Sequence, residues 1–551
     1  MGSALQPLDY AVFILYFFIV SGYGYWIYLK KKSGENTATD FFLAEGALTW
    51  WAIGASLIAS NISAEQFIGM SGSGFAMGLA IASYEWMAAA TLLVVAVFFM
   101  PGYIKNRIFT MPQFLEKRYS PLVATMMAVF WLLVYVFVNL TAILYLGALA
   151  IDSITNFNID FNLFGIPWLH INGFTVCALF LAIFAIFITL GGMKVIGYTD
   201  VIQVAILVLG GLFTTYLALD LVAQQFGTQG AIAGLGLIKS QAPDHFHMIF
   251  DESNKYYKDL PGLTVLFGAM WIANLNYWGC NQYITQRALG ANLETARSGL
   301  LFAAFLKLLM PVIVVLPGIA AYVLYQKGMF QQEMVNAAGE VKPDKAYPVL
   351  LNLLGPGLKG LSFAALTAAI VASLAGKANS IATIFTLDLY NKYVEKGASE
   401  AKQVRVGRWT ILIAMAIAVL VAPQLQKLEQ GFQFIQEFTG LISPGVVAIF
   451  LLGFFWKRAT ANAALVAALV TIPLGIAFKR YIPEVPFLDQ MGYAFLILVA
   501  LMVIISLADP KSKNNPKAME VDTSMFKTSQ TFAIGALLIV GVLAALYIVF
   551  W

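Results

Sequence analysis

Apolar stretches alternate with short polar segments along nearly the whole chain. A helix needs ~20 apolar residues to cross the hydrocarbon core of a bilayer, and about fourteen stretches approach or exceed that length. We expect spans at Ala11–Leu29, Trp50–Gly74, Leu79–Met100, Val123–Asp152, Phe174–Leu190, Asp200–Leu221, Gly262–Gln286, Gly299–Tyr325, Val349–Tyr390, Trp409–Pro423, Phe434–Trp456, Asn462–Phe478, Phe487–Leu507 and Gln530–Trp551. The pattern therefore predicts an all-α polytopic membrane protein.

One predicted span, Trp50–Gly74, is interrupted by a polar block at its centre. The block, Ala59–Gln66, carries Ser60, Asn61, Ser63, Glu65 and Gln66. An unpaired polar group in hydrocarbon costs several kcal/mol, so this block has to face protein or a water-filled cavity. One interpretation is a continuous helix whose polar side chains bond to neighbouring helices. The other is a broken helix whose freed backbone and side chains form a ligand site.

A second polar interruption, Asn274–Gln282, lies in the predicted span Gly262–Gln286. Each interrupted span opens a set of five, Trp50–Leu221 and Gly262–Trp456. Because five is an odd number, the second set must lie inverted relative to the first. Polar breaks at corresponding places in two inverted halves indicate a substrate site near the middle of the membrane.

The expected organisation therefore has five parts. They are residues 1–47 (an extra transmembrane helix and a cytoplasmic linker), 48–222 (the first five-helix repeat), 223–261 (an extracellular loop), 262–456 (the second, inverted repeat) and 457–551 (three C-terminal helices). The two longest loops, Ala223–Pro261 and Gln326–Tyr347, are too short for a catalytic or sensory domain. The first contains Ala231–Leu237, which we expect to form a short surface helix.

Composition agrees with a membrane protein, because 60% of the 551 residues are hydrophobic and only 11% are charged. A soluble domain carries about a quarter charged residues. The net charge of +4 forms no nucleic-acid-binding patch, since the basic residues lie in loops. Cys177 and Cys280 fall in apolar stretches and are expected to pack rather than pair. The first stretch is too long for a signal-peptide core, so it is interpreted as the first span.

Lys and Arg alternate between richer and poorer loops, and the richer loops hold about twice as many, which places them in the cytoplasm. They include Lys105–Arg118, Lys392–Arg408 and Lys511–Lys527. Both termini are then outside, in agreement with an even number of spans, which places the two termini on the same side.

Two opposite charges lie within apolar spans, Glu85 and Lys307. A carboxylate near the bilayer centre costs ~2.5–3.5 kcal/mol, so Glu85 should face protein or water, and Lys307 is its natural partner. A purely structural salt bridge is one interpretation. The other is a polar cavity for a neutral polyol, because one group accepts hydrogen bonds, the other donates them, and the pair adds no net charge.

Three further features each have a structural and a functional interpretation. Asp200 opens a predicted span, either as a helix N-cap or as a carboxylate on an ion pathway. Ala368–Leu374 is a run of mostly small residues that suits close helix packing. Its hydroxyl and backbone oxygens also suit a hard cation such as sodium. Aromatic residues near the polar breaks, including Tyr84 and Tyr277, serve either as core residues or as stacking surfaces for a sugar.

Several long motifs make the chain resemble the solute:sodium symporter family, in particular its sugar-transporting branch. They are Ala55–Gly74, Ala82–Met87, Trp271–Arg287, Phe302–Lys307, Ile381–Tyr390 and Phe434–Pro444. The resemblance extends over nearly the whole chain and is looser in the outer loops and the last spans. It implies a leucine-transporter-type core of two inverted five-helix repeats, each with a broken first helix, and alternating access around a central sugar.

The resemblance also implies roles for individual residues. Those expected to bind sugar are Gln66, Glu85, Asn274, Lys307 and Gln436, with Asn61 close by. Tyr277 would stack on the sugar as the inner gate, and the outer gate would consist of Met70, Tyr84 and Phe432. Sodium would lie among Ala59, Ile62, Ala369, Ala372 and Ser373, with Asp200 near its exit.

Three positions depart from the family pattern. Ala88 stands where the sugar branch has a serine, and Ala372 stands where the first of two serines is usual. Lys377 replaces an apolar residue, four positions after Ser373 and therefore on the same helix face. Our hypothesis at this stage is that Lys377 pairs with Asp200 and weakens or partly replaces sodium. The alternative is that Lys377 extends into the cytoplasmic vestibule without effect.

The sequence thus predicts sodium-coupled symport of a galactose- or glucose-like monosaccharide, with Na⁺ as the coupling ion. The expected location is the bacterial inner membrane, and the expected functional unit is a monomer in the lipid bilayer that binds no nucleic acid. Alternatives within the family are symport of an amino acid, a vitamin or sialic acid. A sugar sensor would carry a signalling domain. A membrane enzyme would need a nucleophile or metal cluster, whereas His170, His245 and His247 all fall in outer loops.

Overall fold

The computed structural model describes residues 5–29, 41–42, 48–155, 159–163, 166–335, 339–352, 354–427 and 431–551. The first half contains α1 (Pro7–Leu29), α3 (Trp50–Asn61), the π-helix η2 (Glu65–Met70), α4 (Ser71–Met77), the 3-10 helix η3 (Gly78–Ala82), α5 (Ser83–Val94), η4 (Val95–Phe99), α6 (Met100–Lys105), α7 (Met111–Arg118), α8 (Pro121–Leu133), η5 (Val134–Leu140), α9 (Thr141–Thr155), α10 (Gly173–Thr189), α11 (Met193–Gln225), α12 (Ala231–Gln241) and η6 (Pro243–Phe246).

The second half continues with helices of similar length. They are α13 (Leu263–Phe267), α14 (Ala269–Gly279), α15 (Gln282–Leu289), α16 (Leu293–Val314), α17 (Leu316–Gln326), η7 (Pro343–Lys345), α18 (Ala346–Asn352), α19 (Leu358–Thr383), η8 (Ile384–Val394), α20 (Glu400–Val421), η9 (Ala422–Lys427), α21 (Gly431–Phe455), α22 (Ala461–Tyr481), α23 (Phe487–Ala508), η10 (Pro510–Ser512), η11 (Thr523–Phe526) and α24 (Gln530–Val549).

Eleven helices in the described part are long and apolar enough to cross a membrane. Helix α10 is apolar but has 17 residues, and the chain at α3–α4 and at α14–α15 is broken into shorter helices. Every predicted span has a helical counterpart, although Val349 belongs to the separate helix α18 and the following span begins at Leu358. The membrane-spanning character is confirmed, and the count of fourteen stays a prediction.

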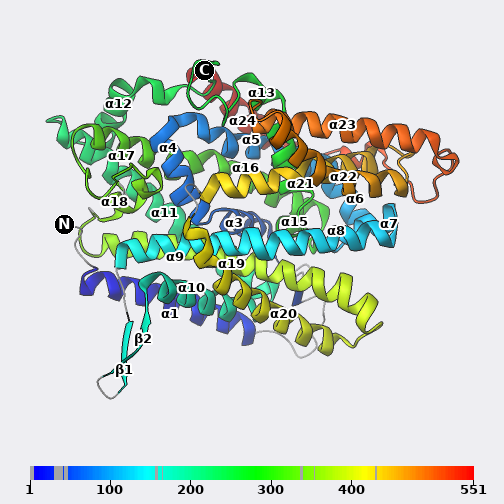
Figure 1. Cartoon of the computed structure of the whole chain (residues 1–551), viewed down its shortest axis with the longest axis horizontal. Helices are drawn as coiled ribbons and strands as arrows, with labels where there is room; N and C mark the ends of the chain where they lie inside the picture. Colours follow the sequence, from blue (N-terminus) through cyan, green and yellow to red (C-terminus); the bar gives the residue numbers. More distant parts are fainter. Residues whose placement is uncertain are drawn as a thin grey trace.

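The fold is helical apart from one short hairpin in the described residues. Strands β1 (Ile159–Leu163) and β2 (Ile166–Ile171) pair antiparallel, with Phe161 opposite Leu169. The hairpin projects from the helical body beside α10 (Figure 1). It lies in a connection between two spans, where a period-two pattern of apolar residues favours strands over a helix.

Helix α19 forms the centre of the bundle. In the best 18-residue window of Leu358–Val394, 89% of the residues are buried inside the protein, against 22% for α1 and for α24. Figure 1 shows α19 running between α9 and α1, roughly parallel to both. Helix α19 packs against α3, α9, α10 and α11. The central helix is therefore the one surrounded by other helices, whereas the terminal helices face outward.

Loops predicted to share one side of the membrane do gather at one end of the protein. Arg297 Nη1 donates to Lys527 O at 2.7 Å, and Lys517 Nζ donates to Glu116 O at 3.1 Å. At the other end, Met248 N donates to Phe550 O at 2.7 Å. These contacts group the connections as expected, while the side of the membrane on which each group lies stays a prediction.

Candidate functional site

The first polar interruption is a break in the helix. Helix α3 ends at Asn61, and Ile62 adopts an extended conformation with φ −82° and ψ 111°. The helical path resumes at Glu65 as a π-helix. Between these points, backbone groups lose their intrahelical partners. The interpretation as a broken helix is therefore confirmed over that of a continuous helix.

Hydrogen bonds among the residues of the break itself replace the missing intrahelical ones. Gln66 Oε1 accepts a hydrogen bond from Ser63 N at 3.0 Å, and Glu65 N donates to Ser63 Oγ at 3.1 Å. Gln66 N donates in turn to Ser63 O at 3.2 Å. The second half-helix thus begins with a side-chain cap formed within four residues.

The second polar interruption is also a break. Helix α14 ends at Gly279, and α15 begins at Gln282 with Asn281 as its N-cap. Asn281 Oδ1 accepts hydrogen bonds from Tyr283 N at 3.2 Å and from the hydroxyl of Tyr135 on η5. Both predicted breaks therefore exist, and each has a hydrogen-bonded cap.

A cavity between the two breaks gathers most of the predicted site. It has about 680 Å³ of space free of protein atoms, part of it open to solvent. The predicted residues that line it are Asn61, Gln66, Met70, Tyr84, Glu85, Asn274, Tyr277, Lys307 and Gln436. They come from α3, η2, α5, α14, α16 and α21, so residues far apart in the sequence converge on one space.

The charged centre of this cavity, the pocket cluster, consists of Asn61, Glu85 and Lys307. The Lys307 ammonium donates to Asn61 Oδ1 and to Glu85 Oε2. The side chains of Lys307 and Glu85 are only 1% and 3% exposed. Lys307 Nζ also lies 5.2 Å from the centre of the Trp278 ring. Removing one partner of such a buried pair costs about 3–5 kcal/mol, because the other charge is left uncompensated.

Several residues that line the cavity were not singled out from the sequence as part of the site. Thr439 and Ser443 follow Gln436 on α21 at helical spacing, and Thr439 Oγ1 is buried with no hydrogen-bond partner among the described residues. Glu65 also lines the cavity. A polar stripe at positions i, i+3 and i+7 of an apolar helix was the signal that could have identified the α21 pair.

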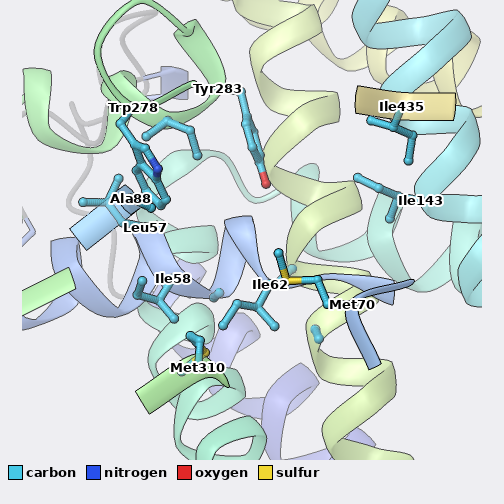
Figure 2. Close-up of a cluster of buried hydrophobic side chains, with 14 of the residues drawn as sticks. Leu57, Ile58, Ile62, Met70, Ala88, Ile143, Trp278, Tyr283, Met310 and Ile435 are labelled. Carbon is cyan, nitrogen blue, oxygen red and sulfur yellow. The ribbon is translucent and has the colours of Figure 1, made fainter. Parts of the chain in front are cut away.

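The expected gate residues lie around the cavity with one exception. Met70, Tyr84 and Tyr277 line it, and the Tyr277 ring lies 5.1 Å from the Trp278 ring and 6.2 Å from the Tyr283 ring, centre to centre. Figure 2 shows Met70 beside Ile62 at the first break, with Tyr283 and Trp278 nearby. The side chain of Phe432 lies outside the described residues.

The predicted ion segment joins α3 to α19. Ser373 Oγ donates to Ser60 O at 2.5 Å, and the Tyr283 hydroxyl lies 3.5 Å from Ser373 Oγ. The other predicted residues, all buried in the core, are Ala59, Ile62, Ala369 and Ala372. Helix α3 ends beside the Ser373 hydroxyl, and hydroxyl and backbone oxygens are the type of donor that a hard cation takes. Ala372 adds no hydroxyl.

Asp200 belongs to a separate group, the anchoring cluster of Ser56, Asp200 and Arg287. Ser56 Oγ donates to Asp200 Oδ2 at 2.5 Å, and Arg287 Nε donates to Ser56 Oγ at 2.8 Å. Arg287 Nη2 lies 3.9 Å from Asp200 Oδ2. The N-cap interpretation of Asp200 is wrong, because α11 begins at Met193 and Asp200 lies inside the helix.

The expected pairing of Lys377 with Asp200 is also wrong, because Arg287 takes that place. Lys377 is 4% exposed, and its Nζ lies 4.2 Å from the centre of the Tyr283 ring. The alternative, in which Lys377 extends into a solvated vestibule, is also wrong, because the side chain is buried.

Two loops cover α4, which continues the helix after the first break. Asp344 of η7 packs against α4 so closely that a Cβ on Gly72 would lie 2.7 Å from Asp344 Oδ1. Burial raises the pKa of Asp344 to about 7, with Lys342 opposing the shift. His245 Nε2 donates to Phe75 O at 3.0 Å, and burial lowers the pKa of this histidine.

Comparison with known proteins gives a consistent picture. A model of the sodium:solute symporter family matches residues 41–471. The chain is 46% identical to a sodium/glucose cotransporter of Vibrio parahaemolyticus, over 99% of each chain. It is 34% identical to human sodium/myo-inositol cotransporter 2, over 86% of this chain and 70% of the relative.

A solved structure shares the fold. It is that of a sodium-coupled sialic acid symporter in a substrate-bound outward-open state, and it superposes with a TM-score of 0.77. The match covers 92% of this chain and 98% of the other at 22% identity, a level that shows the fold alone.

Proposed function

The chain belongs to the sodium:solute symporter family, and from this premise we propose that it imports a glucose- or galactose-like monosaccharide together with sodium. The observation that carries the choice of a sugar is the pocket cluster. Lys307 and Glu85 lie in one cavity as a neutral, buried pair. A neutral polyol can hydrogen-bond to both groups without leaving an ionic charge unmatched.

The cavity supplies hydrogen-bonding groups of both kinds for sugar hydroxyls. Glu85 accepts, Lys307 donates, and the amides of Gln66, Asn274 and Gln436 can do both. Tyr277 offers a ring for stacking at the inner side. Met70, Tyr84 and Phe432 serve as the outer gate. Ala88 removes one possible hydroxyl contact from the wall and leaves room there.

Alternating access follows from the two breaks. We assign residues 48–222 and 262–456 to two inverted repeats that move relative to one another around the cavity. Residues 1–47 and 457–551 supply the flanking helices, and 223–261 forms an outer loop. Sugar held between the breaks would be exposed first to one side and then to the other.

Sodium is the coupling substrate, held by the break and α19. The expected contacts are the Ser373 hydroxyl and backbone oxygens near Ala59, Ile62 and Ala369, with Asp200 on the exit path. One charge moving through ~100 mV contributes ~2.3 kcal/mol, which supports roughly fifty-fold accumulation before the sodium gradient is added. Coupling requires that sodium favour the outward-open state to which sugar binds well.

The proposal also includes the location, the oligomeric state and the orientation of the protein. We place the protein in the bacterial inner membrane as a functional monomer, with both termini outside, and we assign it no enzymatic activity. The relatives named for myo-inositol make another neutral polyol the second candidate substrate. A sialic acid or an amino acid would bring a carboxylate that the neutral pocket cluster does not match.

Uptake into proteoliposomes tests this proposal. We expect radiolabelled glucose or galactose to accumulate only with an inward sodium gradient, and Lys307→Ala to abolish accumulation. myo-Inositol is measured in parallel, and Lys396→Ala, in an exposed loop, is the control. Accumulation of myo-inositol alone would replace the hexose assignment. No accumulation of any of the three would overturn the sugar assignment.

A further inference from the structure

A second cavity, the peripheral groove, lies far from the sugar site in the fold, between α1, α10, α11 and α20. It has about 810 Å³ of space free of protein atoms, part of it open to the surroundings. Figure 1 shows α1, α10 and α20 at the same edge of the helical body. None of the residues that line the groove lines the sugar cavity.

The groove lies near one end of the helices that form it. Its lining comes from the C-terminal ends of α1 and α10, from the start of α11 and from the first half of α20. The loops at this end are those that the distribution of Lys and Arg predicts to be cytoplasmic. The groove is therefore at the level where an apolar bilayer core meets lipid headgroups.

The walls of the groove suit an acyl chain. Val20, Phe187, Ile188 and Val195 line it, and the Phe187 side chain is 53% exposed. Tyr25, which also lines the groove, is 57% exposed. Large exposed apolar side chains on a membrane-spanning helix face lipid, and tyrosine hydroxyls are typical of the headgroup level.

Two polar groups of the groove lack a protein partner. Arg408 is the one charged residue among the described residues that line it. In the described part of the chain, Arg408 Nε is buried without a hydrogen-bond acceptor, and the same part supplies no acceptor or donor for the buried Ser21 Oγ. The guanidinium carbon lies 5.8 Å from the centre of the Phe41 ring. A buried donor without an acceptor is costly, so a ligand that accepts hydrogen bonds would be stabilised here.

We infer that the peripheral groove binds an anionic phospholipid. Its phosphate accepts a hydrogen bond from Arg408, with the Ser21 hydroxyl as a second donor, and an acyl chain lies along α1 and α10. A guanidinium matches the geometry of a phosphate, and basic pockets between membrane helices on the cytoplasmic side bind anionic headgroups. The single positive charge favours an anionic lipid over a zwitterionic one, and the apolar walls favour a lipid over free phosphate.

Competition between two lipids tests the charge. Delipidated protein in detergent is mixed with equal amounts of phosphatidylglycerol and phosphatidylcholine that carry the same acyl chains, and bound lipid is counted by native mass spectrometry. We expect phosphatidylglycerol to bind about 10-fold more tightly, and Arg408→Gln to weaken its binding about 10-fold while phosphatidylcholine changes less than about 2-fold. Arg405→Gln, an exposed position on the same helix, is the matched control and should change neither.

Photo-cross-linking locates the lipid. Phosphatidylglycerol with a diazirine in its acyl chain should label residues 20–28 and 187–191, and Arg408→Gln should remove this labelling. Ser21→Phe fills the groove and should also remove it. Gly22→Phe adds the same ring to α1 at a position with no atom within 4 Å of an added Cβ, and should leave the labelling in place. An excess of inorganic phosphate should not displace the lipid.

Thermal unfolding distinguishes a lipid site from a structural arginine. Phosphatidylglycerol should raise the Tm of the parent but not that of Arg408→Gln, whereas without lipid the two proteins should unfold at the same temperature or the variant at a higher one. A variant that is unstable or unfolded without lipid would make Arg408 a structural residue and overturn the inference.

Four other results would also overturn it. They are equal affinity for the two lipids, an equal effect of Arg405→Gln, cross-links only outside the two segments, and displacement of the lipid by inorganic phosphate, which would make the groove a site for a free anion. All these measurements are made without sugar or sodium, so they stand whether or not the proposed substrate is correct.

Discussion

The two helix breaks carry the same sequence signal, yet they are closed in different ways. The first is closed from within, because Ser63 and Gln66 lie three residues apart. The second also has a local cap, in which Asn281 Oδ1 accepts from Tyr283 N, and it is bonded to other helices as well. Tyr103 donates its hydroxyl to Gly279 O at 2.7 Å, and Met111 N donates to Gln282 Oε1 at 2.8 Å.

This difference separates a ligand-facing break from a structural one. The polar groups of the first break, Asn61, Glu65 and Gln66, line the cavity. Those of the second, Asn281 and Gln282, are bonded to protein, and the cavity is lined instead by Asn274 and Tyr277 from the preceding turns. The first break is also bonded to α19, through Ser60 O and Ser373 Oγ, so the two breaks differ in which of their polar groups line the cavity.

The largest effect is expected on the ligand side of the first break. Lys307→Met removes the ammonium that bonds to Asn61 and Glu85. We expect the free energy of unfolding to fall by about 3–5 kcal/mol, because Glu85 is left buried and unpaired. Sugar affinity should fall about 100-fold, because a charged hydrogen-bond donor to the sugar is lost. Isothermal titration of purified protein with glucose measures this. Lys307→Met with Glu85→Gln should recover folding stability but not affinity, and recovery of both would show that the pair is only structural.

The next largest effect concerns the second break, where we expect a change in the free energy of unfolding. Asn281→Ala leaves the Tyr135 hydroxyl and the Tyr283 N–H without their acceptor. We expect a loss of about 2–4 kcal/mol, since each buried donor costs about 1–3 kcal/mol. Thermal unfolding in detergent measures the loss, with the exposed N-cap variant Asn292→Ala as a milder control. Sugar affinity of the folded protein should change less than about 3-fold, and a selective loss of affinity would contradict the comparison.

Two variants of Gln66 distinguish its role in closing the first break from its role in binding the ligand. Gln66→Ala removes the acceptor for Ser63 N, so we expect stability to fall by about 1 kcal/mol and sugar affinity by about 10-fold. Gln66→Glu keeps the acceptor but loses the amide donor. It should restore thermal stability without restoring affinity. If Gln66→Glu restored both, the amide would have no direct role in binding.

The smallest effect concerns the loop that covers α4, after the first break. The pKa of Asp344 is raised to about 7, so the packed loop favours the neutral carboxyl. Packing is strongest at low pH, weakens as the pH rises from the ordinary value of about 4, and levels off above about 7. Hydrogen exchange of residues 343–352, corrected for intrinsic rates, should therefore be faster at pH 8 than at pH 6. Asp344→Asn should remove this dependence, and an unchanged dependence would exclude Asp344 as its source.

The sequence predicted the breaks and the Glu85–Lys307 pair because both are exceptions to a strict rule. Polar groups inside an apolar span have to be satisfied by protein or ligand, so they stand out in a single sequence. Asp200 was misplaced because Lys194 and Tyr198–Thr199 make the start of α11 polar, and hydropathy then puts the helix start too late. Thr439 and Ser443 were overlooked because single hydroxyls barely alter the hydropathy of a span.

Other features depended on contacts between distant segments. Tyr135 and Asn281 are 146 residues apart, and no local pattern links them. The same holds for Lys377, which packs on the Tyr283 ring and does not pair with Asp200, because Arg287 already occupies that position.

The sequence by itself determined that this chain crosses a membrane repeatedly and breaks two helices near the middle. Lipid offers no hydrogen bonds, so the order of apolar and polar residues has to encode the spans. The tertiary structure decided which polar groups bond to one another and which face the cavity. That choice depends on how the helices are rotated and packed, which brings together Asn61, Glu85 and Lys307 from three separate helices.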